Sequence, residues 1–391
     1  MSLPWSTSAS SILIVLWLLC VLPALDRGSL ERTLMSPAGG LPVLLMLLAV
    51  IGTLWADVSW AERFHGLEGF VKLLLIPLVL ARYRDSERGR WVVIGFLISC
   101  LLVLVSSAVT LGRPDWAKTP GVLVKDYITQ SGEFVLCAFG LLGLAVARLH
   151  RQRWLACGCL ALAALFLAGV FFIATGRTSL VVILVLTVLF AFWNFGWRGI
   201  AGLAGAGVLA IGLWFSSAYL RTQVTDVFSE VEQYRTENTI TRSGERLEFW
   251  RKSILFVAES ALVGNGTGTI ADRFRRSAVA QTGASGQATV NPHSQTFAVA
   301  IQLGLFGVAV LYAIWFAHLR LFRGGGIVAW LGLIMVVQNV VGSLFNSHLF
   351  DFVQGWTYVF GIGVLGGMML RQAGLAEGRL PLTKAAPQAP L

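Results

Sequence analysis

The sequence predicts an all-α fold, a polytopic bundle of membrane-spanning helices, and three observations support this prediction. Of the 391 residues, 56% are hydrophobic and only 13% are charged, which is typical of integral membrane proteins rather than soluble enzymes. Long apolar runs recur along most of the chain. All five cysteines fall inside such runs, which disfavours a disulfide framework or a zinc site.

Crossing a bilayer as a helix takes about 20 apolar residues. Backbone polar groups cannot stay unpaired in lipid, so the apolar runs must be helices. Eleven candidates are found, and a twelfth is possible: 11–25, 41–55, 67–81, 91–111, 133–147, 154–175, 178–193, 199–217, 294–318, 327–345 and 352–370. The first arginine is Arg27, after the first run, so we expect that run to stay as an anchor.

Closely spaced glycines predict tight contacts between some of these helices. They occur in two groups: Gly202, Gly205 and Gly207, and Gly361, Gly363, Gly366 and Gly367.

The stretch 218–292 is the only long part of the chain that is not apolar, and it concentrates charged residues. We therefore divide the chain into an N-terminal transmembrane bundle (1–217), a polar segment (218–292), C-terminal transmembrane helices (293–370) and a tail rich in Ala and Pro (371–391) that we expect to be disordered. A functional site is expected in the polar segment.

The net charge of +10 is better explained by membrane topology than by nucleic-acid binding, because basic residues cluster at alternate helix ends. Placing these clusters in the cytoplasm satisfies the positive-inside rule and puts residues 112–132, 175–177, 218–292 and 346–351 together on the outer face. Lys125 in the first of these loops is then a possible ligand contact. The C-terminus falls in the cytoplasm, and the side of the N-terminus stays open. The clusters are Arg82, Arg84, Arg88 and Arg90; Arg148, Arg151 and Arg153; Arg320 and Arg323; and Arg371, Arg379 and Lys384.

Within the polar segment, Ser243 can cap an amphipathic helix that ends near Gly264. Its face of Leu247, Trp250 and Ile254 is expected to lie against protein or the membrane interface. Arg246 lies at the edge of that face and Arg242 adds positive charge. These basic residues either bind an anionic ligand or meet lipid headgroups. The run Gly264-Asn265-Gly266-Thr267-Gly268 is predicted to be a turn rather than a phosphate-binding loop, because no Walker lysine follows it.

Two further residues stand out by context. Arg177 stands alone between two apolar runs, where it either snorkels to headgroups or grips a phosphate at the outer surface. His293 lies where the polar segment re-enters the apolar region; its imidazole is either structural or a base that accepts a proton from a hydroxyl. His348 and Asp351 share the predicted face and could orient a partner or bind a sugar. No spaced set of metal ligands is found.

In their order, these motifs resemble the O-antigen ligase family, over about residues 130–370. They are Gly176-Arg177-Thr178, Arg246-Leu-Glu-Phe-Trp250, Val263-Gly264-Asn265-Gly266, and His293-Ser294-Gln295 followed by Gln302-Leu303-Gly304-Leu305-Phe306-Gly307. The resemblance implies that Arg177 and Arg246 bind the donor pyrophosphate, that His293 is catalytic and that Asp351 matches the family's acidic position.

The resemblance further implies an inverting glycosyltransferase that moves O-antigen from undecaprenyl pyrophosphate to lipid A core at the periplasmic face of the bacterial inner membrane. Pyrophosphate is a good leaving group and two arginines can stabilise its charge, so no cofactor or divalent metal is expected. The alternatives are an O-antigen polymerase, a protein O-oligosaccharyltransferase or, from another class, a lipid or glycan transporter.

Overall fold

The structure is a computed structural model, and it describes residues 2–113, 121–174, 176–216 and 218–376. Residues 377–391 of the predicted tail lie outside this part. Every regular element in the described residues is a helix, which confirms the all-α prediction. Before the polar segment the α-helices are α1 (Thr7–Val21), α2 (Arg27–Leu34), α3 (Pro37–Gly52), α4 (Trp60–Val71), α5 (Leu75–Arg84), α6 (Gly89–Gly112), α7 (Tyr127–Arg148), α8 (Arg153–Phe172), α9 (Arg177–Phe195) and α10 (Gly199–Ser216).

The rest of the chain adds α11 (Ala218–Glu237), α12 (Arg242–Glu259) and α13 (Ile270–Ala278), and then α14 (Gln295–Leu321), α15 (Ile327–Phe345) and α16 (Phe352–Ala376). Short 3₁₀ turns are η1 (Leu22–Ala24), η2 (Lys72–Leu74), η4 (Gly196–Arg198) and η5 (Gly283–Gly286). The helix α16 reaches Ala376, so the first residues of the predicted disordered tail are helical.

Each of the eleven predicted apolar segments is helical over most of its described residues. Among the described residues, nine helical segments are long and apolar enough, or up to ten if the bent pair α2–α3 counts as one span. That pair is bent by 75°, because Ser36 and Pro37 start a new helix at the bend. The other segment outside the nine is α10. The chain is a multi-pass membrane protein.

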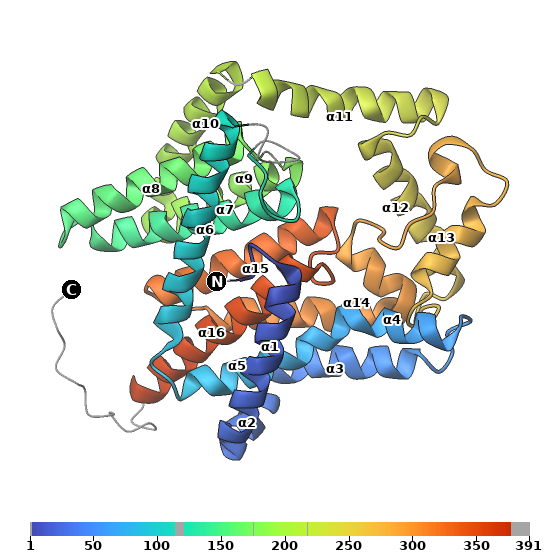
Figure 1. Cartoon of the computed structure of the whole chain (residues 1–391), viewed down its shortest axis with the longest axis horizontal. Coiled ribbons are helices and arrows are strands. Elements are labelled where there is room, and N and C mark those ends of the chain that lie inside the picture. Colours follow the sequence, from blue (N-terminus) through green and yellow to red (C-terminus); the bar gives the residue numbers. More distant parts are fainter. Residues whose placement is uncertain (1, 114–120, 175, 217, 377–391) are drawn as a thin grey trace.

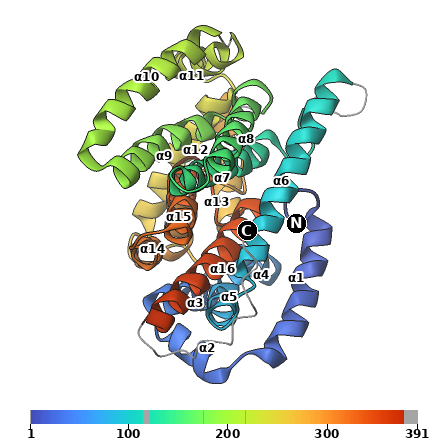
Figure 2. The ribbon, with the colours of Figure 1, turned by 90° about the vertical axis from the view of Figure 1, so that its left-hand side faces the viewer.

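The bundle centres on α16, which packs against α5 on one side and α15 on the other. Figure 1 shows α14, α15, α16 and α5 in the middle of the bundle, and Figure 2 shows α1 and α6 to the right of α16 and α9 and α10 to its left. Gly363 and Gly367 of α16 leave room for Val79 and Tyr83 of α5, as their spacing predicted. Gly205 and Gly207 of α10 differ, because no described atom lies within 4 Å of a Cβ built on either.

The helix α14 is broken at Gly304, whose φ of 62° no helix accommodates. The glycine-rich turn after α12 fills the break. Asn265 N donates to Ile301 O at 2.8 Å and Gly266 N donates to Gln302 O at 3.0 Å, while Leu305 N donates back to Ala261 O at 2.8 Å. This backbone-to-backbone clamp fixes the end of α12 against the helix that follows His293.

The same clamp confirms that the glycine run is a structural turn. After Asn265 and Gly266, Thr267 N donates to Gly52 O at 3.0 Å and Gly268 N donates to the Gln302 side chain at 2.8 Å. Four successive backbone amides are therefore committed to the protein, and none of them is left to cradle a phosphate.

Candidate active site

The polar segment gathers at one end of the bundle, where α12 and α13 pack on the first half of α14 (Figure 1). The helix α12 begins two residues earlier than a cap at Ser243 predicted, because Thr241 is its N-cap and accepts a hydrogen bond from Gly244 N at 3.1 Å. It ends at Glu259, before the predicted end at Gly264.

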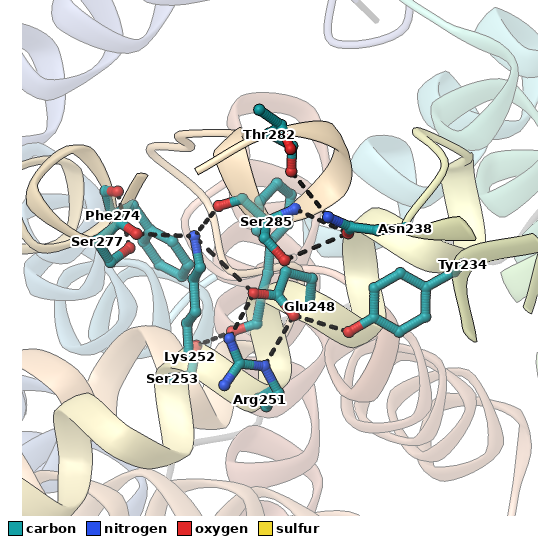
Figure 3. Close-up of polar contacts among 11 residues, drawn as sticks. Tyr234, Asn238, Glu248, Arg251, Lys252, Ser253, Phe274, Ser277, Thr282 and Ser285 are labelled. Carbon is teal, nitrogen blue, oxygen red and sulfur yellow. Dashed lines mark hydrogen bonds and ion pairs between the residues drawn. The ribbon is translucent and has the colours of Figure 1, made fainter. Parts of the chain in front are cut away.

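The side of α12 that is buried in the protein includes two charged residues that the helical periodicity did not single out. Ile254 is 58% exposed, whereas Glu248 and Lys252 are 1% and 3% exposed. Two charged residues can be buried here because they are paired. Figure 3 shows Glu248 accepting hydrogen bonds from Tyr234 at 2.7 Å and from Arg251 at 2.7 and 2.8 Å.

Lys252 completes this network. Its Nζ lies 4.0 Å from Glu248 and donates to Ser285 O at 2.6 Å (Figure 3). The contacts join α11, α12 and the loop before α14, so they fix how α12 is rotated. The side of α12 that carries Arg246 and Trp250 then faces the start of α14.

His293 lies directly before α14 and is half-buried. Its φ of 52° lies in the left-handed region, which is uncommon for a residue other than glycine. Its backbone N–H donates a hydrogen bond to Asn291 Oδ1 at 2.9 Å. The ring stacks on Phe249 with centroids 6.1 Å apart. Trp250 Nε1 donates to the His293 carbonyl at 3.3 Å, which ties the residue to α12.

Asn346 is a residue of this site that the sequence analysis missed. Its Oδ1 lies 3.1 Å from His293 Nδ1, and its Nδ2 donates to Asp351 Oδ2 at 3.2 Å. An amide oxygen can only accept, so Nδ1 of His293 carries the proton and Nε2 has a free lone pair. An asparagine at a helix C-cap is too common a feature to signal this role.

Arg246 is one turn before Trp250 on α12 and is half-buried. Among the described residues it makes no hydrogen bond or ion pair with an acidic side chain. Burial first, and the nearby charges of Arg177 and Arg242, lower the pKa of Arg246. The guanidinium stays charged, so this position has the electrostatics of an anion site.

The pKa of His293 is lowered as well, by burial and then by the charge of Arg246, while the hydrogen bond with Asn346 opposes the shift. The imidazole is therefore neutral at neutral pH and can accept a proton at Nε2.

Arg177 is at the start of α9 and is engaged with Glu230 of α11. Its two terminal nitrogens each donate to one Glu230 oxygen at 2.9 Å, and Nη1 also donates to Ser243 Oγ at 3.1 Å. Burial alone would raise the pKa of Glu230, but the hydrogen bonds from Arg177 and Ser243 lower it to about 2. Arg177 is thus held by a carboxylate beside Arg246.

The remaining candidate residues differ in how deeply they are buried. Arg242 and Lys125 are exposed. Burial raises the pKa of Asp351 to about 6, although Lys125 and Lys72 oppose the shift. His348 is only 8% exposed and lines a cavity between α7, α9, α15 and α16. Burial lowers its pKa to about 4.

Arg177, Arg246 and His293 thus come together from α9, α12 and the start of α14, in the order that the sequence motifs gave. A model of the family described as O-antigen ligase covers this stretch. Residues 162–312 match the O-antigen ligase family. A search of curated proteins finds no significant match.

The O-antigen ligase match contains Arg177, Arg246 and His293, whereas Asn346, His348 and Asp351 follow it in the chain. It confirms the resemblance on which the sequence analysis relied. The match to the O-antigen ligase family supports the assignment of the protein as a membrane glycosyltransferase of the ligase or polymerase type. Such enzymes use a lipid-linked glycan donor.

Proposed function

We propose that the protein is an O-antigen ligase that transfers O-antigen from undecaprenyl pyrophosphate to a sugar hydroxyl of lipid A core. Transfer would take place at the periplasmic face of the bacterial inner membrane, with the C-terminus in the cytoplasm. The observation that carries this proposal is Arg246, a half-buried arginine without an acidic partner among the described residues, placed between Arg177 and a neutral His293.

The proposed roles follow from charge and geometry. Arg246 binds the donor pyrophosphate and stabilises the charge that develops as the sugar–phosphate bond breaks. Arg177 joins it when pyrophosphate displaces Glu230 from the guanidinium. Arg242 and Lys125, both exposed, extend the positive field toward the incoming donor.

His293 is the proposed base. Nε2 removes the proton of the acceptor hydroxyl as its oxygen attacks the anomeric carbon, and the electron pair of the broken bond stays on the pyrophosphate oxygen. Direct displacement inverts the anomeric configuration. The proton later passes from His293 to the released pyrophosphate or to water. Asn346 and Asp351 keep the imidazole in the tautomer that this step needs.

The test is transfer by purified protein, with EDTA present, to lipid A core in one reaction and to a second lipid-linked glycan in another. We expect glycosylated lipid A core, and a loss of roughly 10²–10⁴ in rate for His293→Ala. Arg246→Ala should weaken donor binding and turnover together. Arg235→Ala, an exposed arginine on α11, is the matched control and should leave transfer unchanged.

Elongated lipid-linked glycan would instead identify a polymerase, and glycosylated protein a protein O-oligosaccharyltransferase. Absence of any product would favour a transporter, whereas full activity of His293→Ala would refute the proposed role of His293 as the base. Activity that EDTA abolishes would contradict the expectation that no divalent metal takes part.

A further inference from the structure

A second polar site lies inside the bundle, in a cavity of about 40 Å³ between α7, α9, α15 and α16. Its lining is unusual for the interior of a membrane protein because it contains a carboxylate. Glu133 is 4% exposed, and neither of its oxygens has a hydrogen-bond partner among the described residues. Ionisable residues inside a membrane are costly and are commonly functional.

The other polar side chains around the cavity also present unpaired oxygens. Gln338 and Gln354 each use their amide nitrogen elsewhere, since Gln338 Nε2 donates to Gly132 O at 2.9 Å and Gln354 Nε2 to Thr129 Oγ1 at 3.0 Å. Their Oε1 atoms are left buried without a partner in the described structure, as are Asn339 Oδ1 and Thr357 Oγ1. All of these residues line the same cavity.

The balance of donors and acceptors is therefore uneven. Among the fully buried atoms of this lining without a partner, five are oxygens that accept when Glu133 is ionised, two from its carboxylate and one from each of three amides, whereas two belong to groups that can donate, Thr357 Oγ1 and His348 Nε2. Orphaned acceptors in a low-dielectric interior require a positively charged or hydrogen-donating occupant.

The charge of Glu133 and the size of the cavity restrict which ligand can occupy it. A cavity of about 40 Å³ has room for roughly three water-sized groups. Water can donate hydrogen bonds to these oxygens, but it does not neutralise a carboxylate. Carboxylate, amide and hydroxyl oxygens are the ligands that hard cations prefer. One carboxylate balances one positive charge, whereas a divalent ion would leave a net charge in the membrane interior.

We propose that this cavity binds one monovalent alkali cation, held by Glu133 together with the side-chain oxygens of Gln338, Asn339, Gln354 and Thr357. The ion would join α7, α15 and α16, and the cavity also touches α9 through Thr178, directly after Arg177. It would thereby stabilise the helices beneath the candidate active site. The inference does not depend on the proposed transfer reaction, and EDTA does not remove such an ion.

The test is thermal unfolding of the purified full-length protein in detergent, in NaCl or KCl against choline chloride at equal ionic strength. We expect Na⁺ or K⁺ to raise the unfolding temperature saturably, as a ligand of the folded state does. Glu133→Gln, which keeps the shape and removes the charge, should abolish the shift. Glu31→Gln, at an exposed carboxylate on α2, should retain it.

Direct binding of ²²Na⁺ supplies a second readout, with about one ion per chain expected and none in Glu133→Gln. Thr357→Val repeats the test if Glu133→Gln does not fold, and should weaken the ion's effect. Equal unfolding temperatures in all three salts without ²²Na⁺ binding would overturn the proposal in favour of a protonated Glu133 beside water. A cation shift that persists in Glu133→Gln would overturn it too.

Discussion

Nδ1 of His293 lies 3.1 Å from Oδ1 of Asn346. The two residues are far apart in sequence, one before α14 and the other at the end of α15. Asn346 thereby aims the imidazole and fixes its tautomer.

Replacing Asn346 with Ala should lower kcat while leaving the KM for the donor nearly unchanged. The reason is that a base misplaced by about 1 Å can cost up to about 10²-fold in rate. Steady-state transfer kinetics measure both constants. Asn346→Gln should not rescue the rate, because its longer side chain cannot reproduce the 3.1 Å contact. An unchanged kcat in Asn346→Ala would exclude this positioning role.

The acid limb of the pH profile should report His293. Burial and the charge of Arg246 lower the pKa of His293 below its ordinary value of 6.5, so the neutral base persists to lower pH than a solvated histidine would. Arg246→Gln removes one cause of the lowering and should move the titration to higher pH. The rate of carbethoxylation of His293 as a function of pH measures this without turnover. Arg235→Gln is the control, and a shift of equal size there would contradict the assignment.

Glu230 competes with the donor for Arg177 in the proposed mechanism. Glu230→Gln should therefore tighten donor binding, by about fivefold if one partly exposed charge interaction contributes about 1 kcal/mol. Binding of a lipid-pyrophosphate donor to the purified protein gives the comparison. Asp226→Asn, whose carboxylate is 4.0 Å from Arg177, should have a smaller effect. Weaker donor binding in Glu230→Gln would indicate that the ion pair is structural.

The same carboxylate should make the fold sensitive to acid. The pKa of Glu230 is about 2 in the folded protein against an ordinary value of 4.5. A lowered folded pKa contributes stability above the unfolded pKa, and that contribution is lost as pH falls from about 4.5 toward 2. Thermal unfolding across this range should show a smaller loss in Glu230→Gln than in the parent protein.

The buried network around Glu248 should be needed for stability rather than chemistry. Glu248→Gln leaves Lys252, which is 3% exposed, without its charge partner and should destabilise the protein by about 3–5 kcal/mol. Glu232→Gln, exposed on α11, should change stability by less than about 0.5 kcal/mol. Chemical unfolding in detergent compares them. Equal stabilities would show that the network carries little energy.

The clamp between the glycine turn and α14 predicts that Gly304→Ala is destabilising. A Cβ at position 304 would collide with the backbone of Leu262 and Gly264. In addition, the φ of 62° at this position is strained for any residue other than glycine. The expected cost is at least about 1–3 kcal/mol, measured as a lower unfolding temperature. Gly325→Ala, where a Cβ meets nothing within 4 Å, should be nearly neutral. A Gly304→Ala protein as stable as the parent would refute this account of the break.

Hydropathy and local motifs predicted most helix positions and the candidate site residues of this protein. The apolar runs predicted where the helices lie, because hydrophobic length is a property of consecutive residues. The same local signals located the polar segment and the glycine turn, and they singled out Arg177, Arg246 and His293 as candidate site residues. Among the described residues nine segments are long and apolar enough to span a membrane, or ten with the pair α2–α3, whose bend depends on packing as well as on Pro37.

The tertiary structure decided what those residues contact. The buried face of α12 could not be read from periodicity, because Glu248 and Lys252 are buried only through partners on α11 and in the loop before α14. Separate helices likewise bring together the ion pair of Arg177 with Glu230 and the hydrogen bond of His293 with Asn346. They also gather the oxygens around Glu133. Sequence periodicity describes one helix at a time, whereas the charge balance of a site depends on which helices meet.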